Sequence, residues 1–375
     1  MKNLIIPACL LASAAPFNAF AEVNLSGFGS VVGGISTESD AIVRGYEDSV
    51  EIKQGSFFAL QAYSDLSDGL SATVQVRARG LDDWEPEFTW AYLSYEVDTN
   101  WRIQVGRQRI PIYLYSDYLD VSYAYHWIAP PSEVYKATFD SIDGISSIHD
   151  FSVGDAMVNL RAYYGQEDYT NADGDELELD DVFSVVASVN YGWWTFRTSY
   201  IQFDMTGNIG LGELVNAWKQ TPYGSVGDDL AINEDRLTGF EVGVIFDNQD
   251  WLFLAEYIPS TLENSVIGDY EPWMVSVGKR FGEGKYMIHG TVGEDVVESA
   301  TSVNGVPVGV DPALDALIAT TEGVIDRNTY ENMFYTVGLR WDFHDSAAFK
   351  AEYTHTDLAE GGDAGLFQVA LVTVF

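Results

Sequence analysis

The sequence has one cysteine, little positive charge and no long apolar run after its first residues. The cysteine, Cys9, lies within the first 21 residues, so the rest of the chain contains no thiol that could form a disulfide. Only 19 lysines and arginines stand against 57 aspartates and glutamates, a formal charge of −38 at pH 7. Because such a chain would repel the phosphates of a nucleic acid, we exclude nucleic acid as a partner.

Residues 1–21 have the pattern of a cleavable export signal. The second residue is a lysine, Leu4–Ala15 is a short apolar run, and Ala19–Ala21 has the small-x-small spacing of a signal-peptidase site. We therefore expect this signal peptide to be removed. The alternative is a lipoprotein anchor at Cys9, and the short apolar stretch before that cysteine argues against it.

Beyond the signal, apolar and polar residues alternate with a period of two. No apolar run there approaches the roughly 18 residues that a membrane helix needs, whereas alternation is typical of a strand with one apolar and one polar face. Sixteen segments show it: Val23–Ser36, Ser56–Asp65, Leu70–Arg79, Glu87–Val97, Trp101–Arg109, Asp140–Phe151, Met157–Gly165, Val182–Asn190, Trp193–Phe203, Arg236–Asp247, Trp251–Pro259, Pro272–Phe281, Lys285–Gly293, Tyr330–Asp342, Ala347–Thr356 and Gly365–Phe375. A two-sheet sandwich would give the same alternation, so this pattern alone does not separate it from a membrane barrel.

The connections between the segments separate the two folds. After every even-numbered segment the chain makes a tight turn rich in Gly, Asn, Asp and Ser. After the odd-numbered segments the connection is usually longer. The longest are Thr37–Gly55, Ile110–Phe139, Gln166–Asp181, Asp204–Asp235 and Glu294–Thr329. One trimmed end and one elaborated end are typical of membrane barrels with short periplasmic turns and long external loops.

We therefore predict that residues 22–375 form a single domain, an all-β transmembrane antiparallel β-barrel of about 16 strands. The 10 tryptophans, 22 tyrosines and 20 phenylalanines agree with this fold. Many lie near predicted strand ends, where amphipathic rings sit at the level of lipid headgroups. Such a barrel belongs in the bacterial outer membrane, in contact with its lipids and lipopolysaccharide.

Basic residues lie mostly within the predicted strands. Of the 18 lysines and arginines after residue 21, 13 fall there, and a basic side chain facing lipid at mid-depth would destabilise the barrel by roughly 2–4 kcal/mol. Parity places eight of them on the lumen-facing side: Arg77, Arg79, Arg102, Arg161, Arg197, Arg280, Arg340 and Lys350. Arg107 and Arg109 have the parity of apolar neighbours. We predict that Gly106 marks a bulge that turns both inward; the alternative is a position at the outer rim.

The 30-residue connection Ile110–Phe139 is too rich in tyrosine for a freely solvated loop. We expect it to fold into the lumen, where its rings pack on the wall and its carboxylates face the arginines of the third and fifth strands. The pore would be narrowed there and would carry a transverse field, because fixed charges act this way in selectivity filters. The alternative is an external flap or a protein-contact surface.

Together these features resemble the sixteen-stranded general porins of Gram-negative outer membranes. The resemblance rests on the first strand Val23–Gly29, the segment Val105–Gln108, the long loop directly after the fifth strand, and the terminal Phe375. It implies passive diffusion of ions and small hydrophilic solutes through a homotrimer, with no enzymatic activity and no cofactor. It also implies that the barrel-assembly machinery reads the strand that ends at Phe375.

The resemblance also assigns residues to the constriction. On the loop side it places Asp117, Asp120 and Glu133. On the basic wall side it places Arg77, Arg79, Arg102, Arg107 and Arg109. The second external loop, Gly80–Pro86, is very short here, although in many family members this loop latches onto the neighbouring subunit.

Three other functions stay open at this point. A substrate-specific channel for sugars or anions would use the tyrosines or the arginines. An enzyme would need a nucleophile beside a base, but the five histidines sit in five separate segments. An adhesin would leave the loop rhythm unexplained. The acidic run Asn171–Glu176 lacks the full spacing of a calcium loop, so we expect at most weak divalent-cation binding by the acidic external loops.

The excess of carboxylates predicts a weak preference for cations. The expected reversal potential of the refolded chain in a salt gradient has the sign of cation permeation, and the preference falls as salt rises, because ions screen the acidic mouth. A reversal potential of the opposite sign would contradict this prediction.

Overall fold

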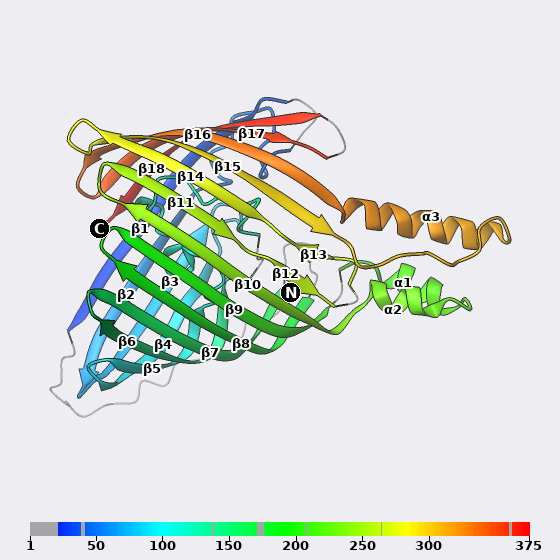
Figure 1. The fold of residues 1–375 in the computed structure, drawn as a ribbon, viewed down its shortest axis with the longest axis horizontal. Coiled ribbons are helices and arrows are strands. Elements are labelled where there is room, and N and C mark those ends of the chain that lie inside the picture. Colours follow the sequence, from blue (N-terminus) through cyan, green and yellow to red (C-terminus); the bar gives the residue numbers. More distant parts are fainter. Residues whose placement is uncertain are drawn as a thin grey trace, which may run out of the picture.

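The computed structural model describes residues 22–38, 42–136, 139–170, 176–207, 209–263, 265–359 and 362–375. The predicted signal peptide and residues 171–175 of the acidic run lie outside these ranges. Within them the predicted fold is confirmed: the chain forms a closed antiparallel β-barrel, seen from the side in Figure 1. The barrel is the scaffold that carries the side chains of its lumen.

Each predicted strand has its counterpart in the barrel. The strands are β1 (Val23–Ser36), β2 (Phe57–Ser67), β3 (Leu70–Arg79), β4 (Pro86–Asp98), β5 (Trp101–Arg109), β6 (Ser141–Val153), β7 (Ala156–Thr170), β8 (Glu176–Tyr191), β9 (Trp194–Gly207), β10 (Ile232–Asp247), β11 (Trp251–Tyr257), β12 (Ser260–Leu262), β13 (Asp269–Tyr270), β14 (Trp273–Phe281), β15 (Tyr286–Glu298), β16 (Tyr330–His344), β17 (Ala347–Asp357) and β18 (Asp363–Val374).

The eighteen strands occupy sixteen positions around the barrel. β10 pairs with both β11 and β12, and β15 pairs with both β13 and β14. β12 and β13 are therefore short continuations of β11 and β14. Pro259 interrupts the first ladder and Pro272 the second, because proline has no backbone N–H to donate.

β1 closes the barrel by pairing with β18 on one edge and with β2 on the other. The backbones of Gly27 and Phe375 exchange two hydrogen bonds, of 2.7 and 2.8 Å. A closed sheet has no edge with unpaired backbone groups, which is what a membrane requires of a strand structure. Figure 1 places the C-terminus at the end with the short turns.

Burial alternates along the strands as predicted. In β17, Lys350, Glu352 and Thr354 are buried, whereas Tyr353 between them is 38% exposed. Large apolar side chains such as Leu60 and Val337 lie exposed on the outside. The barrel thus has a polar inside and an apolar outside, the reverse of a soluble protein and the arrangement that suits lipid.

One predicted loop is wrong in extent. β7 and β8 continue to pair past Gly165 as far as Thr170 and Glu176, so most of the expected loop Gln166–Asp181 is a hairpin. Leu177 and Leu179 alternate with acidic residues there, and Leu179 packs in a buried apolar cluster. The density of acidic residues predicts a solvated loop and masks this short alternation.

Two further predicted loops contain helices that the sequence analysis missed. α1 (Gly212–Lys219) and α2 (Gly224–Leu230) lie between β9 and β10, and α3 (Pro312–Arg327) lies between β15 and β16. Figure 1 shows the three together at the end opposite the short turns. We call them the external cap. Along the described residues no helix combines the length and apolar character needed to cross a membrane.

The cap has its own apolar core. Trp218 of α1, Leu230 of α2 and Ile318 of α3 are all buried in it. Trp218 Nε1 also donates a 2.8 Å hydrogen bond to Thr321 Oγ1. These contacts join two loops that are far apart in sequence into one unit.

The Trp218→Ala substitution tests whether the cap is independent of the barrel. It removes the central ring of the cap core and should destabilise that core by about 3–5 kcal/mol. We expect limited proteolysis to cut the two cap loops faster, while the barrel keeps its heat-modifiable mobility on a gel. Val310→Ala, at an exposed position of the same loop region, is the control. Unchanged proteolysis of the Trp218 variant would refute a shared cap core.

Candidate pore lumen

The segment between β5 and β6 is mostly irregular, with two single 3-10 turns, Ser116–Tyr118 and Ser122–Ala124. Irregular backbone away from water needs partners for its N–H and C=O groups. Side chains of the inner barrel face supply several of them. Glu256 accepts a 2.7 Å hydrogen bond from the N–H of Leu114, and Arg197 donates a 2.8 Å bond to the carbonyl of Pro111.

The middle of the segment is held by two cations of neighbouring strands. Lys350 of β17 is fully buried, and its ammonium has three donors. The ammonium donates hydrogen bonds to three backbone carbonyls, those of Ser122, Tyr125 and Trp127. Arg340 of β16 donates to the carbonyls of Tyr123 and Tyr125 at 2.9 and 2.7 Å. One short stretch of backbone is therefore fixed by two charged side chains.

Carboxylates hold the backbone N–H groups in the same way. Glu352, also in β17, accepts a 2.7 Å hydrogen bond from the N–H of Ile128. Glu256 accepts a second bond, from the hydroxyl of Tyr135, at 2.7 Å. Because both acids and both bases point at the segment, its position is determined at several points along its length.

Apolar contacts place both ends and the middle of the segment on the barrel wall. Ile110, Ile112 and Phe139, at its two ends, pack with residues of β6–β10. Its buried aromatic and aliphatic residues form a cluster with β11, with Ile258 directly after β11, and with β14 and β16. The segment contributes Tyr113, Leu114, Tyr115, Tyr125, Trp127 and Val134, and the wall contributes Leu254, Ile258, Met274 and Phe334. Ile128 packs on β1, β17 and β18 in a second cluster. The wall from β11 round to β1 is therefore covered by the segment.

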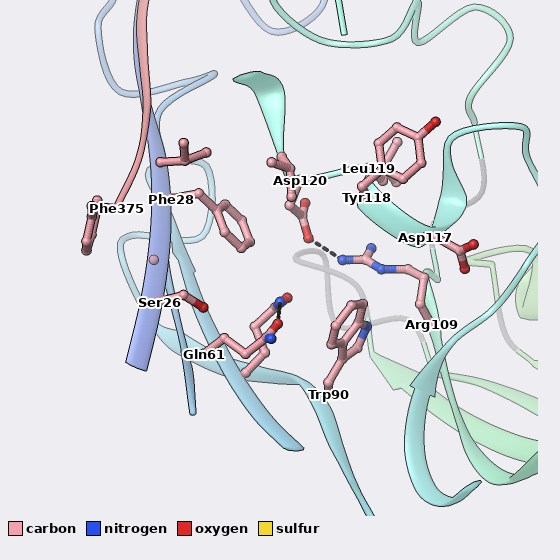
Figure 2. Close-up of a pocket in the computed structure, with 14 residues that line it drawn as sticks. Ser26, Phe28, Gln61, Trp90, Arg109, Asp117, Tyr118, Leu119, Asp120 and Phe375 are labelled. Atoms are coloured by element: carbon pink, nitrogen blue, oxygen red, sulfur yellow. Dashed lines mark hydrogen bonds and ion pairs between the residues drawn. The ribbon is translucent and has the colours of Figure 1, made fainter. Parts of the chain in front are cut away.

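Two of the three predicted loop-side acids pair directly with arginines that were predicted to face the lumen, one of them outside the predicted wall set. Asp120 pairs with Arg77, at 2.5 Å, and with Arg109. Asp117 pairs with Arg161 at 2.7 Å. The acids and bases therefore touch each other instead of facing across open water. Figure 2 shows Arg109 reaching toward Asp120, with Gln61 and Trp90 beside them.

Asp140, just before β6, joins the same group and was not predicted. Its carboxylate lies 2.5 Å from Arg109 and 3.0 Å from Arg77. Burial alone would raise the pKa of Asp140, yet the two guanidinium groups hold that pKa well below its usual range. The carboxylate thus stays charged and completes an alternating cluster of acids and bases.

The third predicted acid has a partner that the sequence analysis missed. Glu133 binds Arg44 through two hydrogen bonds, of 3.1 and 2.5 Å. Arg44 lies in the first external loop, which thereby contacts the segment. A bidentate pair of this kind fixes both geometry and distance. No sequence signal links two residues 89 positions apart.

The other predicted bases have different partners. Arg79 pairs with Asp82 in the short second loop at 2.6 Å, and Arg102 lies 3.6 Å from Asp150. Arg280 binds Asp247 through two bonds, of 2.7 and 2.8 Å. These three contact carboxylates of strands and turns.

Arg107 and Arg109 do not behave alike, and the predicted bulge at Gly106 is wrong. The ladder between β5 and β6 runs through Gly106 without a register shift, although the φ of this glycine is +126°. Arg107 pairs with Asp143 and Glu167 of the next two strands. Arg109, at the end of β5, lines a cavity of the lumen. The strand end frees Arg109 from the alternation that still governs Arg107.

Two cavities that share lining residues lie along β2–β7, and the first also borders β1 and the C-terminal end of β18. One measures about 360 Å³ and the other about 410 Å³, and both are lined by Gln61, Trp90, Arg109 and Asp117. Figure 2 shows the first of them; Phe375 lies on the far side of β1, away from the labelled polar side chains. A third cavity, of about 420 Å³, lies between the segment and β10–β16.

Several solved structures share this barrel at low sequence identity. The outer-membrane channel DcaP of Acinetobacter baumannii is 12% identical with a TM-score of 0.60, over 96% of this chain and 98% of that one. The anion-selective porin from Comamonas acidovorans is 12% identical with a TM-score of 0.60, over 95% and 100%. The trimer form of OmpT, an outer membrane protein of Vibrio cholerae, is 13% identical with a TM-score of 0.57, over 94% and 99%. The chain has the fold of outer-membrane porins.

The likeness is one of fold. No protein-family model and no curated protein matches the sequence. A porin fold supplies the barrel, and the chemistry of the lumen follows from the side chains of this chain.

The Lys350→Met substitution tests how the segment is held. It leaves the carbonyls of Ser122 and Trp127 without their donor, whereas the carbonyl of Tyr125 keeps Arg340. Each buried unsatisfied group destabilises by about 1–3 kcal/mol. We expect amide hydrogen exchange in the segment to speed up roughly tenfold or more, while the strands stay protected. Lys285→Met, at an exposed turn position, is the matched control. Equal exchange in both variants would show that Lys350 does not hold the segment.

Proposed function

We propose that the chain is an outer-membrane porin through which ions and small hydrophilic solutes diffuse passively. The observation that carries the proposal is the distribution of charge: acids and bases line the inside of a closed barrel whose outside is apolar. Burying charges in this way destabilises a packed core. It suits a lumen that holds water.

The segment Ile110–Phe139 is proposed to narrow the pore. Support comes from its hydrogen bonds to inward-facing side chains on several strands, including β9, β11, β16 and β17. A segment tied to so many strands lies across part of the lumen at a fixed place. The free cross-section is then set by the segment and by the wall that it leaves uncovered.

The proposed constriction has Asp117, Asp120 and Glu133 on the loop side. On the wall side the bases nearest these acids are Arg77, Arg109 and Arg161. Because these groups pair directly, the field that a solute meets is local and falls off within a few ångströms. The ion preference is therefore expected to be weak, and the acidic exterior sets its sign.

The location, oligomeric state and assembly of the chain are also proposed. We propose that the chain resides in the outer membrane as a homotrimer, among lipids and lipopolysaccharide, after the barrel-assembly machinery reads the strand ending at Phe375. The trimer form of OmpT of Vibrio cholerae, which has the same fold, supports the oligomer. We assign no catalytic role and no cofactor to the chain.

Single-channel recording of the refolded chain in a planar bilayer tests the proposed function. Large ohmic openings in groups of three are expected of a trimeric porin. Small openings that one solute class blocks completely would favour a specific channel. A folded barrel that never opens would refute the proposal.

Two substitutions in one ion pair give a sharper prediction. Asp117→Asn leaves Arg161 unpaired beside the cavity and should move the reversal potential toward anions. Arg161→Gln leaves Asp117 unpaired and should move it toward cations. The control is Arg236→Gln, which breaks an exposed pair with Asp204. Shifts of the same sign in both test variants would place this pair outside the permeation path.

A further inference from the structure

We infer that the two cavities along β2–β7 form a binding site for an uncharged polyhydroxylated solute, such as a short oligosaccharide. The inference rests on the proposed porin function and names a solute class for its lumen. It combines three observations: where the open space lies, how its charges are balanced, and which neutral groups line it.

Apolar contacts leave the β2–β5 side as the polar route, because Ile142 of β6 and Tyr163 of β7 pack with Ile110 at the start of the segment. The third cavity lies beside Leu252 of β11. Toward the external end the next inward residues are Leu254, Glu256 and Ile258, and all three are buried under the segment. Apolar packing and the hydrogen bonds of Glu256 therefore close that cavity on its external side. Along β2–β5 the corresponding level holds the ion pairs of Arg77 and Arg109, which are charged groups although both side chains are buried.

The charges that line this route cancel. The two cavities are bordered by three arginines (Arg102, Arg109 and Arg161) and three carboxylates (Glu96, Asp117 and Asp120). Each of these arginines has a carboxylate within 3.6 Å. A charged solute would have to compete with an existing ion pair, whereas a neutral solute would not.

Neutral hydrogen-bonding groups fill the rest of the lining. The amides of Gln61 and Gln75 bond to each other at 2.9 Å, and Gln104 and Gln108 line the opposite side of the second cavity. An amide both donates and accepts, as a hydroxyl does. A row of glutamines therefore matches the edge of a sugar ring, where hydroxyls of both roles alternate.

Two aromatic rings complete the site. Trp90 and Tyr92 take successive inward positions of β4, with ring centroids 6.1 Å apart. The C–H face of a sugar packs on such rings. Trp90 Nε1 is moreover buried and has no hydrogen-bond partner among the described residues. Buried donors are normally paired, and a solute hydroxyl in the cavity would pair this one.

The experiment uses the refolded chain and the trisaccharide maltotriose as the probe. Channel current is recorded in planar bilayers against maltotriose concentration for the wild type, Trp90→Ala and Trp90→Phe. We expect the wild-type current to fall to a plateau as maltotriose is added. The maltotriose concentration that gives half of this fall should be about fivefold higher in Trp90→Ala. Trp90→Phe, which keeps a ring and loses the N–H, should lie between them. Tyr191→Ala, on the exposed outside near a turn, should match the wild type.

Sugar viscosity acts equally on all four proteins and thus cancels in the comparison. Equal, linear falls in current in all of them would overturn the site and leave the porin function standing. Calorimetry of maltotriose binding to the detergent-folded barrel gives a readout that does not need conduction. If the wild type binds maltotriose and Trp90→Ala abolishes this binding, the site is supported even in a barrel that never opens. A barrel of that kind would refute only the porin function. Absence of wild-type binding would overturn the site.

A second experiment, cysteine labelling, tests which cavity lies on the path of the permeating ions. Residues 22–375 contain no cysteine, so a single introduced thiol can be labelled with a charged reagent. Thr73→Cys lies in the second cavity and Ile245→Cys in the third. Labelling is expected to lower the current only in the Thr73 variant. A change confined to the Ile245 variant would put the route on the other side of the segment and contradict the inference.

Discussion

Backbone groups that are removed from water must be paired, and this constraint shapes both parts of the structure. The wall satisfies it through closure, since β1 pairs with β2 and β18 and leaves no free edge. The irregular segment inside cannot use a ladder. It depends on side chains of the wall, chiefly Lys350 and Arg340 for its carbonyls and Glu352 and Glu256 for its N–H groups. These charged residues are therefore structural parts of the lumen.

The same constraint explains why ionised residues are tolerated on the inner face. A buried charge without partners is strongly destabilising, but the ammonium of Lys350 faces three carbonyl dipoles, and Arg77 faces three carboxylates. Removing one member of such a set leaves the others uncompensated. Individual residues are therefore harder to replace than the surrounding apolar ones.

The sequence predicts the long strands well because each of them presents an apolar face to the outside of the barrel. Where that pattern ends, prediction fails. Past Gly165 the strands are dominated by acidic residues, and only the short run with Leu177 and Leu179 alternates. The buried apolar residues of the cap helices pack in a core of their own. A signal for α3 exists, since Asp311 caps it and Pro312 follows, but a long loop was expected there.

For the lumen, parity identifies which residues point inward, and it cannot identify their partners. Lys350 is on the inner face by parity, yet only the folded path of the segment brings three carbonyls to it. Arg44 lies in a loop with no parity at all. Pairing between elements distant in sequence depends on loop conformation, which alternation does not encode.

The asymmetry of the lumen follows from where the apolar residues of the segment fall. Tyr113, Trp127 and Ile128 each need an apolar wall, and β11–β18 provide it through residues such as Met274 and Phe334. Asp117 and Asp120 are then turned toward β3–β7, where arginines meet them. Apolar packing thus determines which part of the barrel wall the segment covers. Ion pairs form along the boundary with the part of the wall that stays uncovered.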